Sequence, residues 1–157
     1  PSPFAFIIWA PIFIGELLMM LYLTNAEQAA ALGRAVAPGW VAATAAQTLW
    51  CGAFRPSVCG PALLWIPSLL LGTTALFLGV SHRALRAISA TSSPPAALSP
   101  LGNLLVRWPL TLHFGWICAA SLVNLNNWLA RSAAPLATPA APAPSRRRRP
   151  RRPTPSR

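Results

Sequence analysis

The stretch that decides the fold runs from Trp108 to Leu129 and reads WPLTLHFGWICAASLVNLNNWL. Three other long apolar runs precede it, Phe4–Leu23, Val36–Phe54 and Ala62–Val80. At a rise of about 1.5 Å per residue, each run can cross the ~30 Å hydrocarbon layer of a membrane as a helix. Backbone groups in lipid must bond within the segment, and such runs do not fit barrel strands of about 10 alternating residues. The sequence therefore predicts an all-α fold, a polytopic bundle of four transmembrane helices.

Composition supports a membrane protein and argues against an enzyme. The chain is 54% hydrophobic and only 10% charged, whereas a soluble domain usually has about 25% charged residues. Its two acids are too few for a Ser-His-acid arrangement, and its two His and three Cys residues are scattered along the sequence. No zinc-binding spacing and no phosphate-binding glycine loop occurs in the sequence. We expect a protein without catalytic residues.

The sequence divides into a helical bundle, residues 1–132, and an Ala/Pro/Arg-rich tail, residues 133–157. A tail of this composition cannot form a packed core, and we expect it to be extended. Nucleic acid is not an expected partner, because no aromatic stacking residues accompany the arginines. Such a tail does not order itself, so a partner surface that holds it would favour a subunit of a larger assembly. The tail arginines predicted to contact a partner or anionic lipid are Arg146, Arg147, Arg148, Arg149, Arg151 and Arg152.

One side of the last run carries polar and aromatic residues at helical spacing. Its members are His113, Trp116, Ala120, Asn124 and Asn127. Residues three and four apart lie on one face of a helix. A polar face in a membrane should turn toward the bundle or a cavity. Two interpretations remain open, in which these side chains either bridge neighbouring helices or line a ligand site.

Two titratable residues lie inside the apolar runs. Glu16 is a carboxylate in the middle of the first run, where an ionised acid is costly. It should be protonated, paired with an Arg or His, or near the end of a tilted helix, and we favour a structural ion pair over proton transport. His113 is either hydrogen-bonded within the bundle or an axial ligand to a tetrapyrrole metal.

The spacing of Trp116, Asn124 and Trp128, with Ala119-Ala120 between them, resembles the last helix of the tryptophan-rich sensory protein or translocator protein (TspO/MBR) family. The start of the chain, PSPFAFIIWAPIF, is similar to that family's proline-rich entry, with Phe13 where Tyr is usual. The resemblance extends from Pro1 to about Leu129. The family has five helices, and the four runs match its second to fifth. The first helix would then lie upstream, have been removed, or never have been present.

The resemblance implies a pocket for planar hydrophobic ligands such as chlorophyll or another tetrapyrrole. The candidate ligand-binding residues are Trp9, Trp50, His113, Trp116, Asn124 and Trp128. Sterol binding is not expected, because no Tyr follows the last helix. Three further tryptophans, Trp40, Trp65 and Trp108, are interpreted as interfacial belt residues near the ends of the runs.

We therefore expect a TspO-like accessory subunit of an organellar photosynthetic membrane complex, surrounded by lipid and other membrane subunits. A plastid thylakoid is favoured over a mitochondrial membrane. The alternative is a free-standing tetrapyrrole-binding sensor or transporter. The cysteines Cys51, Cys59 and Cys118 are expected to be free thiols, with a Cys51–Cys59 disulfide as the alternative.

Overall fold

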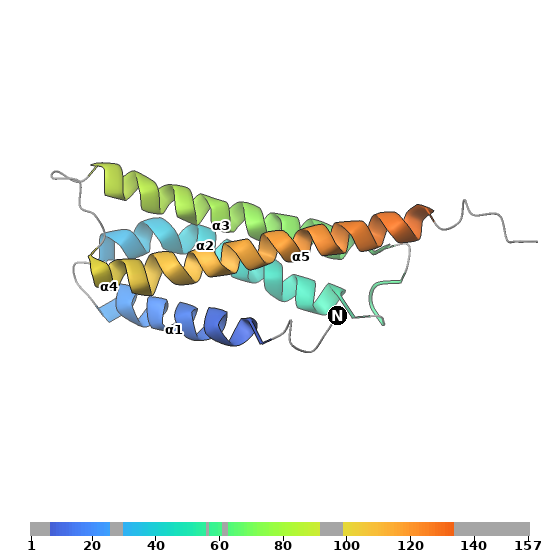
Figure 1. Ribbon diagram of the computed structural model, residues 1–157, viewed down its shortest axis with the longest axis horizontal. Coiled ribbons are helices and arrows are strands. Elements are labelled where there is room, and N and C mark those ends of the chain that lie inside the picture. The colour runs from blue at the N-terminus through green and yellow to red at the C-terminus, as the bar shows by residue number, and fades with distance from the viewer. Residues whose placement is uncertain (1–6, 26–29, 56, 61–62, 92–98, 134–157) are drawn as a thin grey trace, which may run out of the picture.

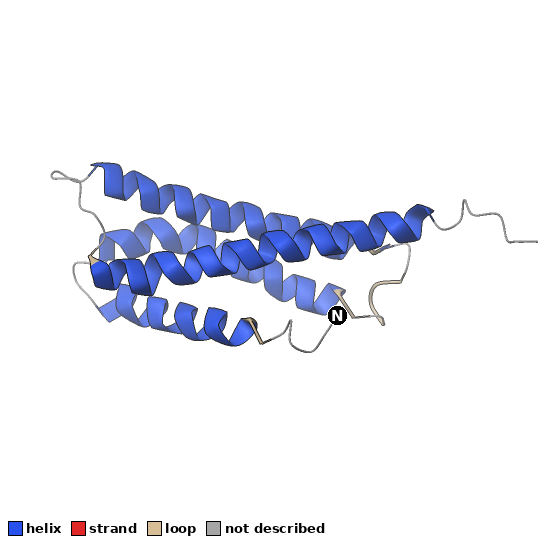
Figure 2. Cartoon of the chain, in the orientation of Figure 1, coloured by secondary structure: helices blue, strands red, loops and turns tan. Residues whose placement is uncertain are grey.

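The computed structural model describes residues 7–25, 30–55, 57–60, 63–91 and 99–133. These residues form α1 (Trp9–Asn25), α2 (Ala30–Ala53), α3 (Trp65–Thr91), a short turn α4 (Pro100–Gly102), the π-helical segment η4 (Asn103–Arg107) and α5 (Trp108–Ala133). Within the described part of the chain there is no strand (Figure 2). The predicted all-α fold is confirmed. The predicted contacts of the tail, from Arg146 to Arg152, lie outside the described residues.

The four long helices lie side by side along the long axis of the molecule (Figure 1). The packing is uneven. Helix α3 is the most extensively packed, against α2 on one side and α5 on the other, whereas α1 makes fewer contacts with α5 and α2. Helix α1 is thus the least tightly packed member of the bundle.

Each helix buries one stripe of residues at steps of three and four. In α1 the buried residues are Ile12, Gly15, Glu16 and Met19. In α3 they include Leu71, Thr74, Leu78, Ser81 and Leu85. This spacing places the residues on one face of each helix. All four long helices carry polar side chains on their buried faces, namely Glu16, Gln47, Thr74, Ser81 and His113.

A close approach of the α2 and α3 backbones occurs at Gly39. A Cβ atom at this position would lie 2.5 Å from Ser81 Oγ and 2.8 Å from the Phe77 carbonyl oxygen. Only glycine leaves room for this contact. Ser81 Oγ uses the proximity to donate a hydrogen bond of 3.0 Å to the Val36 carbonyl oxygen. Helix α2 is therefore in direct backbone contact with α3 between Val36 and Gly39.

Two predicted boundaries are wrong at the same end of the bundle. Helix α2 begins at Ala30 instead of Val36, because Leu32 continues its buried stripe. Helix α3 continues past Val80 to Thr91. The apolar run was predicted to end at Val80, but Ser81 and Leu85 continue the buried face of the helix beyond it.

The last helix is also preceded by a longer helical segment than expected. Residues 100–107, which were placed outside the final run, form α4 and η4, and α5 then extends to Ala133. Ser99 caps this segment, because its Oγ accepts a hydrogen bond from the Gly102 backbone N–H at 3.0 Å. The helical rod that begins at Pro100 is therefore continuous with α5.

By length and composition, one helix of the described chain, Trp65–Ala90, is long and apolar enough to cross a membrane; α1 is apolar but shorter. The expectation of four membrane-spanning helices stays a prediction. Large apolar side chains nevertheless point outward on every long helix. Examples are Ile14 (61% exposed), Leu49 (64%), Leu76 (65%) and Val123 (65%). Contiguous exposed apolar surface indicates contact with lipid or with other proteins.

Candidate functional site

A buried chain of polar side chains connects three helices in the interior of the bundle. Glu16 of α1 and His113 of α5 are 6% and 1% exposed. Glu16 Oε1 lies 2.6 Å from His113 Nδ1. On the other side of the imidazole ring, Gln47 Oε1 of α2 lies 2.6 Å from His113 Nε2. His113 therefore bridges α1 and α2 from within α5.

A fourth residue, Trp40 of α2, completes this polar cluster. Its indole Nε1 donates a hydrogen bond of 2.8 Å to Glu16 Oε1. The interpretation of Trp40 as a belt residue at a helix end is wrong. Because α2 begins at Ala30, Trp40 lies ten residues inside the helix, where it is half-buried. We refer to Glu16, Trp40, Gln47 and His113 as the polar cluster.

The polar cluster gives its buried groups hydrogen-bond partners. Glu16 Oε1 has two partners, His113 Nδ1 and Trp40 Nε1. Each ring nitrogen of His113 also has a partner, Glu16 Oε1 on one side and Gln47 Oε1 on the other. Polar groups are tolerated in a low-dielectric interior when they are hydrogen-bonded in this way.

The expected pairing of Glu16 with an Arg or His has a specific form in the structure, a buried side-chain contact of 2.6 Å with His113. The signal in the sequence was the spacing of Glu16 from Ile12 and Met19, which places the carboxylate on the buried face of α1. Gln47 was not predicted as a site residue. It lies on the buried stripe of α2 with Ala43, so its helical spacing in the sequence could have identified it as a buried residue.

Aromatic side chains pack beside the polar cluster where α1 meets α5. The Trp9 ring meets the His113 imidazole edge-on, with 6.1 Å between centroids, and meets Trp116 at 6.2 Å and an interplanar angle of 87°. Phe13 stacks on the other side of Trp9 at 5.4 Å. The structure thus brings together three of the six predicted ligand-binding residues.

The other three predicted residues lie elsewhere. Trp50 stacks on Phe54 within α2, with ring centroids 5.1 Å apart. Asn124 donates its side-chain N–H to the Ala120 carbonyl oxygen of its own helix at 3.0 Å. Trp128 lines a separate surface depression between α3 and α5. Within the described chain, no hydrogen bond and no aromatic ring contact joins these three side chains to Trp9, His113 or Trp116.

The role of His113 as an axial metal ligand does not fit this arrangement. Binding a tetrapyrrole metal requires a free lone pair on one imidazole nitrogen. Both ring nitrogens already have partners at 2.6 Å. Within the described residues there is also no group of three or more His, Cys, Asp or Glu side chains that could hold a metal ion.

Two indole N–H groups near the core have no acceptor among the described residues. They belong to Trp50 and Trp116, and both nitrogen atoms are buried. A buried donor without an acceptor costs about 1–3 kcal/mol. Trp116 is the more informative of the two because it also lines a depression of about 380 Å³ on α5, beside the start of α1. We call this the α1–α5 depression; its other walls include Ile8, Trp108, Leu112 and Gly115.

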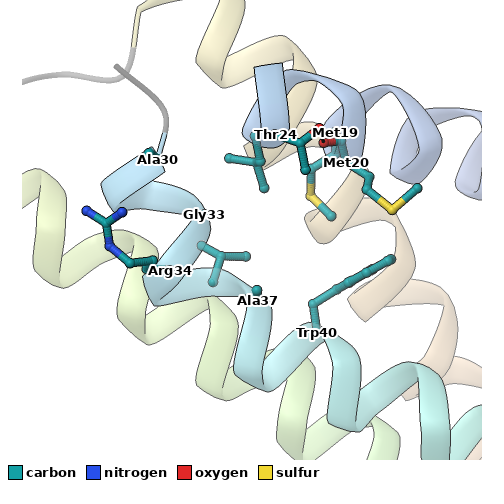
Figure 3. A pocket seen from close by; sticks show the side chains of 10 residues that line it. Met19, Met20, Thr24, Ala30, Gly33, Arg34, Ala37 and Trp40 are labelled. Carbon is teal, nitrogen blue, oxygen red and sulfur yellow. Dashed lines mark hydrogen bonds between the residues drawn. The ribbon is translucent and has the colours of Figure 1, made fainter. Parts of the chain in front are cut away.

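A second depression of about 380 Å³ lies between α1 and α2. Met19, Met20 and Thr24 extend from α1, and Gly33, Ala37 and Trp40 face them from α2 (Figure 3). Because Trp40 also donates to Glu16, this depression adjoins the polar cluster. The sparse contacts between α1 and α2 leave this side of the bundle open.

The sequence matches the model of a known protein family. The family model described as TSPO-like protein matches residues 1–136. The chain belongs to the TSPO-like family. The resemblance noted from Trp116, Asn124 and Trp128 is thereby confirmed, and the chain is a membrane protein of the TspO type. Neither the curated proteins nor the solved structures include a match to the chain.

The three cysteines are free thiols, as expected from the sequence. Cys51 is exposed, Cys59 is buried, and Cys118 is half-buried. Cys59 Sγ donates to the Leu63 carbonyl oxygen at 2.9 Å. This hydrogen bond gives the Cys59 thiol a structural role near the start of α3.

Proposed function

We propose that this TSPO-like protein binds a planar hydrophobic ligand of the tetrapyrrole class in the α1–α5 depression, without chemical conversion of the ligand. The observation that carries the proposal is the convergence of Trp108 and Trp116 on a largely apolar depression, where Trp9 packs edge-on against Trp116. Aromatic rings provide large apolar contact area and favourable stacking geometry for a flat ligand. Apolar pockets with few polar groups are typical small-molecule sites.

The Trp116 indole N–H is buried beside the proposed site and has no acceptor among the described residues. In the proposed complex, the Trp116 side chain shifts enough for a carbonyl or carboxylate group of the ligand to accept this hydrogen bond, which removes the cost of the buried donor. The polar cluster affects the proposed ligand site indirectly. It holds His113 against Trp9, and Trp9 in turn contacts Trp116, so the ring orientations depend on it.

Titration of the purified protein with metal-free protoporphyrin IX tests the proposal. The Trp116→Phe variant keeps an aromatic ring but loses the N–H donor, and we expect affinity to fall about fivefold, the value of one net hydrogen bond. Trp116→Ala should weaken binding further because the stacking surface is also lost. Quenching of tryptophan fluorescence reports the binding.

Trp128→Phe is the matched control. Trp128 is half-buried on the same helix but lines a different depression, so its replacement should leave affinity unchanged. Equal affinities for wild type, Trp116→Phe and Trp116→Ala would rule out the α1–α5 depression as the site. A zinc porphyrin should bind no more tightly than the metal-free form, because both ring nitrogens of His113 already have partners. Much tighter binding of the zinc porphyrin would show that His113 gives up its contact with Gln47 and binds the metal.

We further propose that the protein acts as an accessory subunit of an organellar photosynthetic membrane complex. The supporting observation in the described chain is the outward-facing apolar surface on every long helix, which suits subunit contacts as well as lipid. The size of the native complex after mild detergent extraction tests this assignment. Migration as a free monomer or homodimer would instead favour an independent sensor or transporter.

A further inference from the structure

A groove on the outer face of the bundle, where α3 meets α5, is separate from the proposed ligand site. Its volume is about 470 Å³. Residues that line it include Gly72, Ala75, Gly79, Arg83 and Arg86 of α3 and Phe114 of α5. We call it the α3–α5 groove.

The apolar part of the α3–α5 groove exists because small residues lie along α3. A Cβ atom at Gly72 would meet nothing within 4 Å, and one at Gly79 would meet only the Phe114 ring at 3.9 Å. From Gly72 to Arg83 the helix rises about 16 Å, since each residue contributes about 1.5 Å. The groove is therefore an apolar channel that ends at two guanidinium groups.

The two arginines of the groove lack a negative partner in the described chain. Arg83 and Arg86 are exposed. Glu16 is the only described acid, and it is buried with His113; the other acid of the sequence, Glu27, lies outside the described residues. Arginine presents a planar fork of donors that matches phosphate oxygens.

We propose that the α3–α5 groove binds a membrane phospholipid with an anionic headgroup. One acyl chain lies along Gly72, Ala75 and Gly79, and the headgroup phosphate accepts hydrogen bonds from Arg83 and Arg86. The apolar length and the paired positive charges at one end match the two parts of such a lipid. This site is independent of ligand binding in the α1–α5 depression.

Charge argues against a second copy of the chain as the occupant. A two-fold symmetric dimer places the same patch on both partners. Packing two α3–α5 grooves together in parallel would bring the arginines of both copies, Arg83 and Arg86, toward one another. Like charges at an interface oppose association, whereas an anionic headgroup neutralises them.

The test measures lipid retention by the full chain. The protein is purified in mild detergent and incubated with dioleoyl phosphatidylglycerol or, in a parallel sample, dioleoyl phosphatidylcholine, which has the same chains and no net charge. Native mass spectrometry then counts bound lipids. We expect the wild type to retain one phosphatidylglycerol at concentrations where phosphatidylcholine is lost.

Two groove variants separate the headgroup contact from the acyl contact. Arg83→Gln/Arg86→Gln should weaken retention about 30-fold, because each arginine near anionic lipid contributes about fivefold. Gly72→Leu fills the open channel without changing any charge and should also weaken retention. Gly72→Ala, which adds only a methyl group where no atom lies within 4 Å, provides a milder version if the Leu variant folds poorly.

Matched controls lie at the other end of the bundle. Arg55→Gln/Arg131→Gln removes the same charge from two exposed arginines, and Gly52→Leu adds the same side chain at an open position of α2. Both control variants, which also keep the arginine-rich tail, should retain the lipid as the wild type does.

Three results would overturn the proposal. One is equal retention of the two lipids. Another is loss of lipid in the arginine variant but not in Gly72→Leu and Gly72→Ala, which would indicate general surface attraction. The third is a dimer that Gly72→Leu converts to a monomer, which would assign the groove to a second copy.

Discussion

His113→Leu provides the sharpest test of the polar cluster. The substitution removes both 2.6 Å contacts, to Glu16 and to Gln47, and replaces the ring by an apolar side chain of similar size. It leaves the Glu16 carboxyl group with Trp40 as its remaining partner and the Gln47 oxygen without its contact. Breaking a buried ion pair by removing one member costs about 3–5 kcal/mol. We expect the free energy of unfolding to fall by that amount.

The triple variant Glu16→Leu/Gln47→Leu/His113→Leu should be less destabilised than His113→Leu alone. Replacing all bonded partners by apolar groups of similar volume removes the desolvation cost together with the bonds. The Trp40 N–H then remains as the unpaired group, at about 1–3 kcal/mol. The expected order of stability is therefore wild type, triple variant, single variant.

Unfolding in mixed micelles, followed by circular dichroism as the fraction of denaturing detergent increases, measures these differences. A cost below about 1 kcal/mol for His113→Leu would refute the reasoning, because it would mean that water or another group replaces the lost contacts. So would a triple variant whose cost equals the sum of the three single substitutions, since independent sites add.

Further predictions concern packing and thiol exposure, and each can be measured separately. Gly39→Ala should destabilise the bundle by about 1–3 kcal/mol, because its Cβ would lie 2.5 Å from Ser81 Oγ; an unchanged melting temperature would contradict the close approach. Gly52→Ala, where the added Cβ meets nothing within 4 Å, should stabilise α2 by about 0.5–1 kcal/mol in the same thermal assay. A maleimide reagent should modify exposed Cys51 faster than buried Cys59, and equal rates measured by mass spectrometry would show that the segment around Cys59 opens.

The helices were predictable because their apolar runs are long, but their ends were not. Hydropathy alone placed the end of one run at Val80, since His82 and Arg83 follow it. The buried stripe of α3 nevertheless continues through Ser81 and Leu85. A buried stripe of every third or fourth residue can continue past charged residues on the other face of the helix, so average hydropathy alone does not locate the helix end.

The polar cluster was only partly predictable. Glu16 was recognisable in the sequence as a carboxylate inside an apolar run, and a His or Arg partner was expected. Its choice of His113 depends on contact between residues 97 positions apart in the sequence, which only the packing of α1 against α5 determines. Gln47 gave a weaker signal, because an amide in an Ala-rich helix carries no charge that demands a partner.

The sparse packing of α1 gives the polar cluster a consequence for helix alignment. Sliding α1 along its axis by one turn, about 5.4 Å, would bring a larger side chain to the point where Gly15 meets Pro109, although a Cβ atom at Gly15 would already lie 3.0 Å from Pro109 Cβ. The same shift would carry Glu16 out of reach of both His113 and Trp40. The close approach at Gly15 and these directional hydrogen bonds together select one longitudinal position for α1 against its neighbours.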